Sequence, residues 1–514
     1  MTVTTWRRVN LGLFALLLVT VLLTPRLPFQ DYPNWIYQGD AYHWLLTAAP
    51  SGEAFEIRSA FVPNSTVTVI LGCLDLILPP DLSGRLLVAF ILVLTFVGLR
   101  QLFRGVNDRA AGEPLALILS AHLFLFYGFL SFSLGLALVF LFITKGGNGE
   151  TYVSRLMGWT FAFVLLYYTH FLAFGLMAGY ALVQGVLFKE RRRFAPSVIL
   201  PALVIPAVLF ALYVQTSGGV NATEWSYSPA FKAGLLFKSL AVAYAFNDTR
   251  EMVELTSVIA VNAFAWLGLL TLVWRLTRGR WRTICREPEL VMAIVLMLVG
   301  FAMPYKLAGV YYLESRFYFV AVVLALSALL RKGALPGKQV IVVLSAAASL
   351  VLIGKSAMTA IQGYNEGKFE RSVSKAVGDV PYYSPVMLGF ELPEYYPHAT
   401  GAAAKLGKVC PMINCRNQVP LYAMAARRMV YPGMFETGLL SCRLPRCDAR
   451  LALEKSPSRQ MPLCRTFLFV SPPGFTAAFR QLVDERMTVI AEDQQFILAA
   501  TEDDRLPPPE RATP

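Results

Sequence analysis

The chain has 514 residues, of which 56% are hydrophobic and 15% are charged, and its formal net charge is +13. Soluble domains carry roughly 25% charged residues, so this composition excludes a disordered protein and a small secreted disulfide protein. It also excludes a nucleic-acid binder, which would display its basic residues on a highly charged surface. The composition indicates an α-helical polytopic membrane protein.

Eleven apolar segments approach the roughly 17–25 residues that a helix needs to cross a bilayer core about 30 Å thick. The first resembles a signal peptide but lacks a small-residue cleavage site, so we expect it to remain as the first membrane span. The predicted spans are 9–24, 83–103, 113–128, 130–145, 155–169, 171–188, 196–215, 256–274, 289–304, 316–330 and 339–354.

The apolar stretch Val67–Leu78 is too short to cross the bilayer and ends before Pro79-Pro80, so we predict that it lies along the membrane surface. With this stretch outside the bilayer, nineteen Lys and Arg residues fall in loops on one side of the membrane. The positive-inside rule then places these loops and the N-terminus in the cytoplasm and the C-terminus outside.

This topology predicts a transmembrane domain, residues 1–354, and a soluble outer domain, residues 355–514. Two large outer loops are expected, at 25–82 and 216–255. An apolar run at 233–246 in the second loop indicates another helix along the membrane surface.

The tail is more polar than the rest of the chain and shows short patterns of its own. Thr466–Ser471 is a β-type apolar run, and Phe475–Glu485 has the apolar spacing of a helix. Met487–Thr501 has the pattern of two strands joined by a polar turn. The tail is therefore predicted to be a small α/β domain.

Five of the seven cysteines also lie in the tail. Paired Cys-x4-Cys spacings are compatible with a metal site, but disulfides are favoured because the predicted outer compartment is oxidising. The spacing does not fix their pairing. These cysteines are Cys410, Cys415, Cys442, Cys447 and Cys464.

The segment from Pro28 to Trp35, Pro-Phe-Gln-Asp-Tyr-Pro-Asn-Trp, follows the first span directly. Its acidic residue, Asp31, is placed to act as a base on an acceptor hydroxyl or to hold a cation. The other interpretation is a structural one, in which Asp31 caps the helix that begins near Trp35.

Two basic residues, Lys306 and Arg316, bracket a later outer loop and are candidates for binding phosphate. The alternatives are anchoring at the membrane interface and pairing with Glu314. His170, at the outer turn between two spans, is a candidate for a substrate hydrogen bond or for a purely structural histidine.

The Asp31 motif, the later Pro63-Asn64 and Arg85 at the start of the second span together resemble the C superfamily of glycosyltransferases, the GT-C fold. This resemblance implies an inverting enzyme of the bacterial inner membrane that takes sugar from a polyprenyl-phosphate carrier. Asp31 would be the catalytic residue, and the partners would be the carrier-linked donor, the bilayer and a glycan, lipid or protein acceptor. No nucleic acid is implied.

Two positions depart from the motif of that superfamily. Trp35 stands where a histidine is usual, and Gln38 where an arginine is expected. We predict that nearby polar side chains contact substrate instead. These are Tyr32, Asn34, Asp40 and His43. No metal-ligand set is predicted, because the second outer loop lacks the acidic residue common in the superfamily. A divalent metal as cofactor stays open.

Two other classes of function fit a polytopic chain of this kind. A transporter or flippase for sugars or lipid-linked sugars usually shows repeated halves and ionisable groups inside its spans, and this chain shows no repeat. A non-catalytic scaffold of a polysaccharide assembly machine is favoured by the departures at Trp35 and Gln38. The sequence does not determine the sugar, the acceptor or the oligomeric state.

Overall fold

The structure is a computed structural model of the chain. It describes 3–29, 31–49, 54–104, 109–188, 192–217, 287–303, 313–331 and 338–379, with short segments in 306–311, 386–390, 421, 440–442, 466–470 and 480–500. The predicted span 256–274 and the apolar run 233–246 lie outside these residues.

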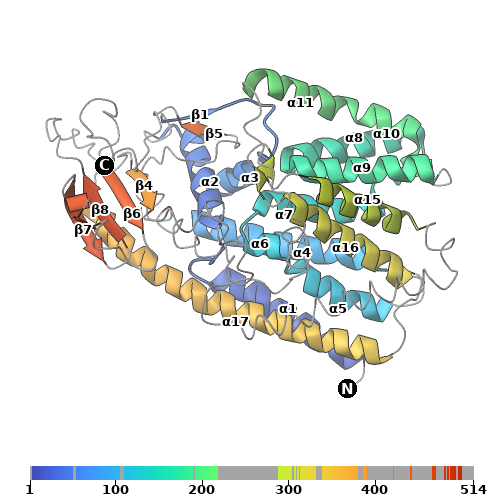
Figure 1. Ribbon diagram of the computed structural model, residues 1–514, viewed down its shortest axis with the longest axis horizontal. Coiled ribbons are helices and arrows are strands. Elements are labelled where there is room, and N and C mark those ends of the chain that lie inside the picture. Colours follow the sequence, from blue (N-terminus) through green and yellow to red (C-terminus); the bar gives the residue numbers. More distant parts are fainter. Residues whose placement is uncertain are drawn as a thin grey trace.

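A bundle of apolar helices forms most of the molecule, as expected for a polytopic membrane protein (Figure 1). Ten of the eleven predicted spans coincide with helices of this bundle. The helices are α1 (Val3–Leu23), α4 (Pro80–Leu102), α5 (Arg109–Ser120), α6 (Leu123–Phe126), α7 (Leu130–Lys145), α8 (Tyr152–Thr169), α9 (Phe171–Leu187), α10 (Pro196–Ala202), α11 (Val204–Ser217), α15 (Pro288–Ala302), α16 (Leu313–Arg331) and α17 (Lys338–Ala376).

Two of the predicted spans each consist of two shorter helices. The segment predicted as one helix over 113–128 consists of α5 and α6, and His122 at the break accepts a hydrogen bond from the backbone of Leu125 through Nδ1. The segment over 196–215 breaks at Leu203, because Pro206 has no N–H to donate to the carbonyl of Ala202.

The first loop folds into two helices beside the bundle, α2 (Tyr32–Leu46) and α3 (Thr66–Leu74), and a short strand, β1 (Phe55–Ile57). At nine residues α3 is only about 14 Å long, far too short to cross a bilayer, as predicted for Val67–Leu78. The two helices pack backbone to backbone at Gly39 and Gly72. A Cβ on Gly39 would lie 2.5 Å from Cβ of Leu71, so neither helix could carry a larger residue there without moving apart.

The longest helix, α17, continues 22 residues past the predicted end of the last span at 354 and reaches Ala376. The fall in hydrophobicity at 355 predicts the end of the span, but the sequence from 355 to 376 contains no proline and continues the helix in polar form. Its 39 residues span roughly 58 Å, about twice the thickness of a bilayer core. The far end of α17 reaches the sheet of the tail (Figure 1).

The tail contains a four-stranded sheet with the order β4-β6-β8-β7. Its strands are β4 (Val386–Phe390), β6 (Thr466–Val470), β8 (Phe496–Ala500) and β7 (Thr488–Asp493). β4 pairs parallel to β6, and the other neighbours are antiparallel. The predicted strands over 466–471 and 487–501 are confirmed, and residues 480, 481, 483 and 484 within the predicted helix are helical.

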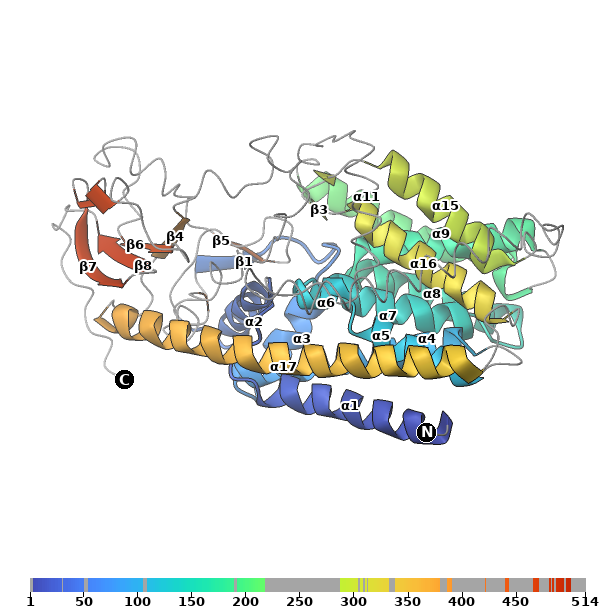
Figure 2. The same ribbon diagram turned by 60° about the horizontal axis from the view of Figure 1, so that its bottom comes forward.

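A second link joins the tail to the first loop. β1 pairs antiparallel with β5 (Leu440–Cys442), as Figure 2 shows. Phe55 lies opposite Cys442 in this pair. The predicted disulfides lie outside the described side chains, so they stay a prediction. Phe369 of α17 contacts Phe496 of the sheet with ring centroids 6.5 Å apart, which fixes the sheet to the end of the long helix.

Candidate functional site

Asp31 lies in the turn that precedes α2, next to the turn that follows α6. Its backbone N–H donates to the carbonyl of Tyr127 at 3.0 Å, and its carbonyl accepts from the N–H of Trp35 at 3.3 Å. Its carboxylate makes no capping hydrogen bond to the described backbone of α2. The capping role considered for Asp31 is therefore not the one its side chain performs in this structure.

Gly128 allows the two turns to come together. Its φ of +77° lies in the left-handed region, and a Cβ there would be 2.6 Å from the backbone nitrogen of Tyr32 and 2.7 Å from that of Asp31. The indole N–H of Trp35 donates to the carbonyl of Gly128 at 2.9 Å. Trp35, one of the two departures from the superfamily motif, thus holds Asp31 in place.

Arg316, in the first turn of α16, is buried at 5% exposure. Its Nη1 lies 3.2 Å from Nε2 of His170, and its guanidinium carbon lies 4.6 Å and 4.8 Å from the ring centroids of Phe129 and Phe132. Its Nε has no hydrogen-bond partner among the described residues. The negative charge of Asp31 acts favourably on this guanidinium.

His170 separates α8 from α9 and is the N-cap of α9. The backbone N–H of Leu172 points at its Nδ1 at 3.2 Å, and its ring contacts that of Phe132 at 5.2 Å. Burial, and then the neighbouring Arg316, hold the pKa of His170 well below its usual value. The ring is therefore neutral at physiological pH.

The other predicted residues of the first loop lie along α2. Tyr32 is buried with its hydroxyl against Gly84 of α4, and burial raises its pKa above the ordinary value, so the phenol stays protonated. Asn34 is buried, and its Oδ1 has no hydrogen-bond partner within the described part of the chain. Asp40 and His43 lie nine and twelve residues beyond Asp31, roughly 14 Å and 18 Å along the helix axis. The structure therefore does not bring these last two to Asp31.

Gln38, the second departure from the motif, has a structural role. Its Oε1 accepts a buried hydrogen bond of 3.2 Å from Thr68 Oγ1, which ties α2 to α3. Arg85 is also structural, since it donates to the carbonyls of Leu22 at 2.7 Å and Thr24 at 3.4 Å and so caps α1. Asn64 accepts a hydrogen bond of 2.8 Å from the backbone of Phe171 at the start of α9.

Lys306 lies on β2 (Lys306–Leu307), which forms a hairpin with β3 (Val310–Tyr311) just before α16. Its backbone is therefore close in the chain to Arg316, and its side chain is outside the described residues. No group of three or more metal-binding side chains gathers within the described segments.

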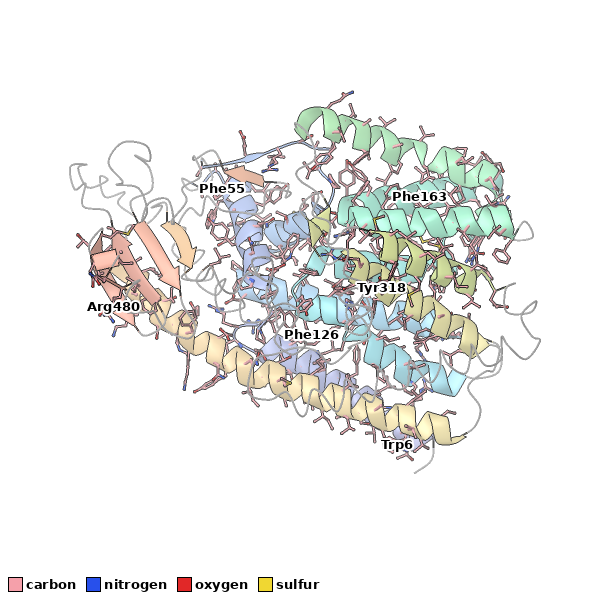
Figure 3. The ribbon with its side chains drawn as sticks, viewed as in Figure 1. Trp6, Phe55, Phe126, Phe163, Tyr318 and Arg480 are labelled. Atoms are coloured by element: carbon pink, nitrogen blue, oxygen red, sulfur yellow. The ribbon has the colours of Figure 1, made fainter. Side chains whose placement is uncertain are left out.

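Lys355 on α17 is a buried cation that the sequence reasoning missed. It is 3% exposed, and its Nζ lies 4.0 Å from the ring centroid of Phe126, which is labelled in Figure 3. The sequence predicts that residue 355 begins the soluble outer domain, where a lysine is ordinary. The signal that could have found it is the unbroken helical pattern across 355, since charges inside membrane helices are usually functional.

No protein-family profile and no curated protein sequence matches the chain. Its structure is similar to the crystal structure of ArnT, a GT-C glycosyltransferase, from Cupriavidus metallidurans bound to undecaprenyl phosphate. The TM-score is 0.53 at 13% identity, over 99% of this chain and 100% of that one. For the same ArnT in the apo state the TM-score is 0.52 at 14% identity, over 97% and 98%.

The chain has the GT-C fold. The resemblance inferred from the Asp31 motif is thereby confirmed at the level of the fold. The likeness covers almost the whole chain. At 13–14% identity this likeness shows the fold and not the roles of individual residues.

Proposed function

We propose that the protein is an inverting membrane glycosyltransferase that moves a sugar from a polyprenyl-phosphate carrier to an envelope acceptor. The observation that carries this proposal is the buried guanidinium of Arg316, on which the charge of Asp31 acts. The GT-C fold supports it, and so does the undecaprenyl phosphate in the similar ArnT structure.

Arg316 is suited to hold the phosphate of the carrier. A guanidinium has five N–H donors, and the described residues offer this one a single neutral acceptor, the imidazole of His170. Burying a charge with so few partners is costly unless an anion completes the site. A phosphate accepts two parallel hydrogen bonds from arginine and would satisfy the donors that remain.

Asp31 is suited to act as the base. As the acceptor hydroxyl attacks the anomeric carbon, the carboxylate takes the hydroxyl proton, and the bond from that carbon to the phosphate oxygen breaks. The phosphate leaves with the electron pair, and Arg316 stabilises the charge that develops on it. The backbone hydrogen bond from Asp31 to Tyr127 and the bond from the Trp35 indole to Gly128 fix the position of the base.

The remaining predicted residues complete the proposed site in supporting roles. Lys306 would add a second cation for the phosphate, and Tyr32 and Asn34 would line the site next to Asp31. Asp40 and His43 would contact the part of a substrate that extends along α2. The alternative role of Asp31, as a ligand for a divalent cation, also stays a proposal.

The proposed topology has eleven spans in the bacterial inner membrane with a cytoplasmic N-terminus. Residues 1–354 would form the transmembrane domain, with outer loops 25–82 and 216–255, and residues 355–514 a periplasmic domain stapled by disulfides. The nineteen basic residues of the cytoplasmic loops support this orientation. It places Asp31, His170 and Arg316 on the periplasmic side.

Sugar transfer by the purified protein in lipid nanodiscs tests the proposal directly. Transfer from a radiolabelled undecaprenyl-phosphate sugar should be seen with the wild type, and Asp31→Asn should lower it by about a hundredfold or more. Binding of undecaprenyl phosphate should survive in Asp31→Asn and be weakened about tenfold or more in Arg316→Ala. Arg371→Ala, which removes an exposed arginine on α17, is the matched control.

Three other outcomes of these measurements would contradict the proposal. Full transfer by Asp31→Asn would refute its role as base. Exchange of sugar across the membrane of proteoliposomes without transfer would identify a transporter, and carrier binding with neither activity would indicate a scaffold.

A further inference from the structure

His170 lies between two hydrogen-bond donors. The backbone N–H of Leu172 points at Nδ1 at 3.2 Å, and Nη1 of Arg316 lies 3.2 Å from Nε2. The arginine side chain and a backbone N–H can donate hydrogen bonds but cannot accept them. Both neighbours of the imidazole ring therefore need a ring nitrogen with a lone pair as hydrogen-bond acceptor.

A neutral imidazole has one lone pair in the ring plane, on the nitrogen that carries no proton. It cannot accept from both neighbours at once. Protonating the ring would remove the last lone pair and place a second positive charge against Arg316 in a buried site. Two neutral arrangements of His170 remain, and they differ only in which nitrogen holds the proton.

In the first arrangement the proton is on Nδ1, so Nε2 accepts from Arg316 and α9 loses its N-terminal cap. In the second the proton is on Nε2, so Nδ1 caps α9 and an N–H faces the guanidinium. A hydrogen bond to a charged donor is stronger than a neutral cap. The first arrangement is therefore favoured as long as Arg316 binds no phosphate.

A phosphate bound to Arg316 would reverse this preference. Phosphate oxygens would satisfy the guanidinium, and the contact with the imidazole would no longer be needed. In the second arrangement the N–H at Nε2 could itself donate to a phosphate oxygen next to Arg316, while Nδ1 restores the cap of Leu172. The change moves one proton off Nδ1 to water and brings one to Nε2 from water or the arriving phosphate, so the ring stays neutral.

The surrounding aromatic rings restrain the guanidinium of Arg316, so it cannot move away from His170 to another hydrogen-bond acceptor. The guanidinium lies between Phe129 and Phe132, and Phe132 also contacts the ring of His170 at 5.2 Å. Stacking on aromatic faces restrains the plane of the guanidinium.

We propose that His170 is a positioning residue for Arg316. Without phosphate, its Nε2 accepts a hydrogen bond from Arg316; when a phosphate group binds Arg316, the proton of His170 moves from Nδ1 to Nε2. We call this change the hand-over. This inference rests on the proposed function, because it needs a phosphate-bearing ligand at Arg316. His170 would then be neither a fixed substrate ligand nor a passive structural residue, because its hydrogen bonds change when the phosphate binds.

Solid-state ¹⁵N NMR of protein labelled at histidine tests the hand-over. The chain has four histidines, and the signals of His170 are assigned by their loss in His170→Asn. Without ligand we expect the proton on Nδ1, and with saturating undecaprenyl phosphate we expect it on Nε2. A parallel sample with inorganic phosphate shows whether the phosphate group is enough or the lipid chain is needed.

Carrier binding is measured on the same samples by native mass spectrometry, which separates the two ways to fail. If undecaprenyl phosphate does not bind, the proposed function is wrong. If it binds and the His170 proton stays on the same nitrogen, only the hand-over is wrong.

Two substitutions separate the hold on Arg316 from the cap of α9. His170→Asn keeps a good N-cap for α9 but is too short to reach Arg316, whereas His170→Gln can reach it. We expect His170→Asn to weaken carrier binding about tenfold at an unchanged melting temperature, and His170→Gln to recover most of the loss. Wild-type binding by His170→Asn would overturn the proposal.

Discussion

The indole of Trp35 and the carbonyl of Gly128 share a hydrogen bond of 2.9 Å that closes the turn after α6 against the backbone of Asp31. Two segments almost a hundred residues apart are thereby locked together at the proposed base. The position of Asp31 depends on a residue, Gly128, that has no side chain and no chemistry of its own.

Gly128→Ala should damage the site without touching its reactive groups. The new Cβ would meet the backbone nitrogens of Asp31 and Tyr32 at 2.6–2.7 Å in a backbone conformation that alanine rarely adopts. We expect a loss of stability of about 1–3 kcal/mol and a large fall in transfer. Gly354→Ala, in open space on α17, is the control and should be neutral or slightly stabilising. Equal melting temperatures for the two variants would contradict this account of the turn.

Arg316→Lys should separate charge from geometry. Lysine keeps the positive charge but cannot make the two parallel hydrogen bonds of a guanidinium or stack between Phe129 and Phe132. We expect transfer to fall by roughly 10- to 100-fold while membrane insertion and yield stay unchanged. Arg371→Lys serves as the exposed control. Wild-type transfer by Arg316→Lys would show that a point charge is enough.

Asp75, at the end of α3, should make stability depend on pH. Burial raises its pKa to about 6, while a hydrogen bond from Ser83 acts in the opposite direction. Because the folded state binds more protons than the unfolded state between about pH 4 and 6, stability should fall as pH rises through this window.

Asp75→Asn removes the titrating group and should flatten this dependence. At pH 7.5 we expect it to be more stable than the wild type by about 1–2 kcal/mol, allowing for partial exposure. Melting temperatures measured from pH 4.5 to 8 provide the test. Parallel pH profiles for the two proteins would mean that Asp75 does not titrate in this range.

Arg26 should couple the first loop to α17. Its guanidinium pairs with Asp81 at the start of α4 and lies 3.5 Å from Glu370, and both acidic partners belong to elements far away in the sequence. A double-mutant cycle with Arg26→Ala and Glu370→Ala should give a coupling energy of about 0.5–2 kcal/mol. A coupling energy of zero would show that the two residues contribute independently.

Hydrophobicity was enough to predict most of the bundle, because a membrane helix must satisfy its own backbone and shows this as an apolar run. It failed where the helix and the apolar run have different lengths. α17 continues in polar sequence beyond 354, and the helix expected over 113–128 breaks at His122. The strand β4 and the pairing of β1 with β5 were not predicted, since both depend on partners far away in the chain.

Asp31 could be singled out from the sequence because it follows a membrane span within a short motif. The contact of Arg316 with His170 could not, because these residues are 146 positions apart and sequence periodicity describes only local structure. Trp35 and Gln38, which the motif marked as departures, bind Gly128 and Thr68 and support the first loop. Lys355 was missed because a fall in hydrophobicity was equated with the end of a helix.

The uninterrupted length of α17 has a mechanical consequence. Near Gly363 the helix rests on Thr24 and Arg26, and at Glu370 it is tied to Arg26, so this region is a fulcrum. The fulcrum at Gly363 lies 13 residues, roughly 20 Å, from Ala376 and eight residues, roughly 12 Å, from Lys355, so a tilt of about 5° would displace these two points by about 2 Å and about 1 Å. A force on the sheet beyond Ala376 would therefore shift the buried Lys355 in the opposite direction, as in a lever.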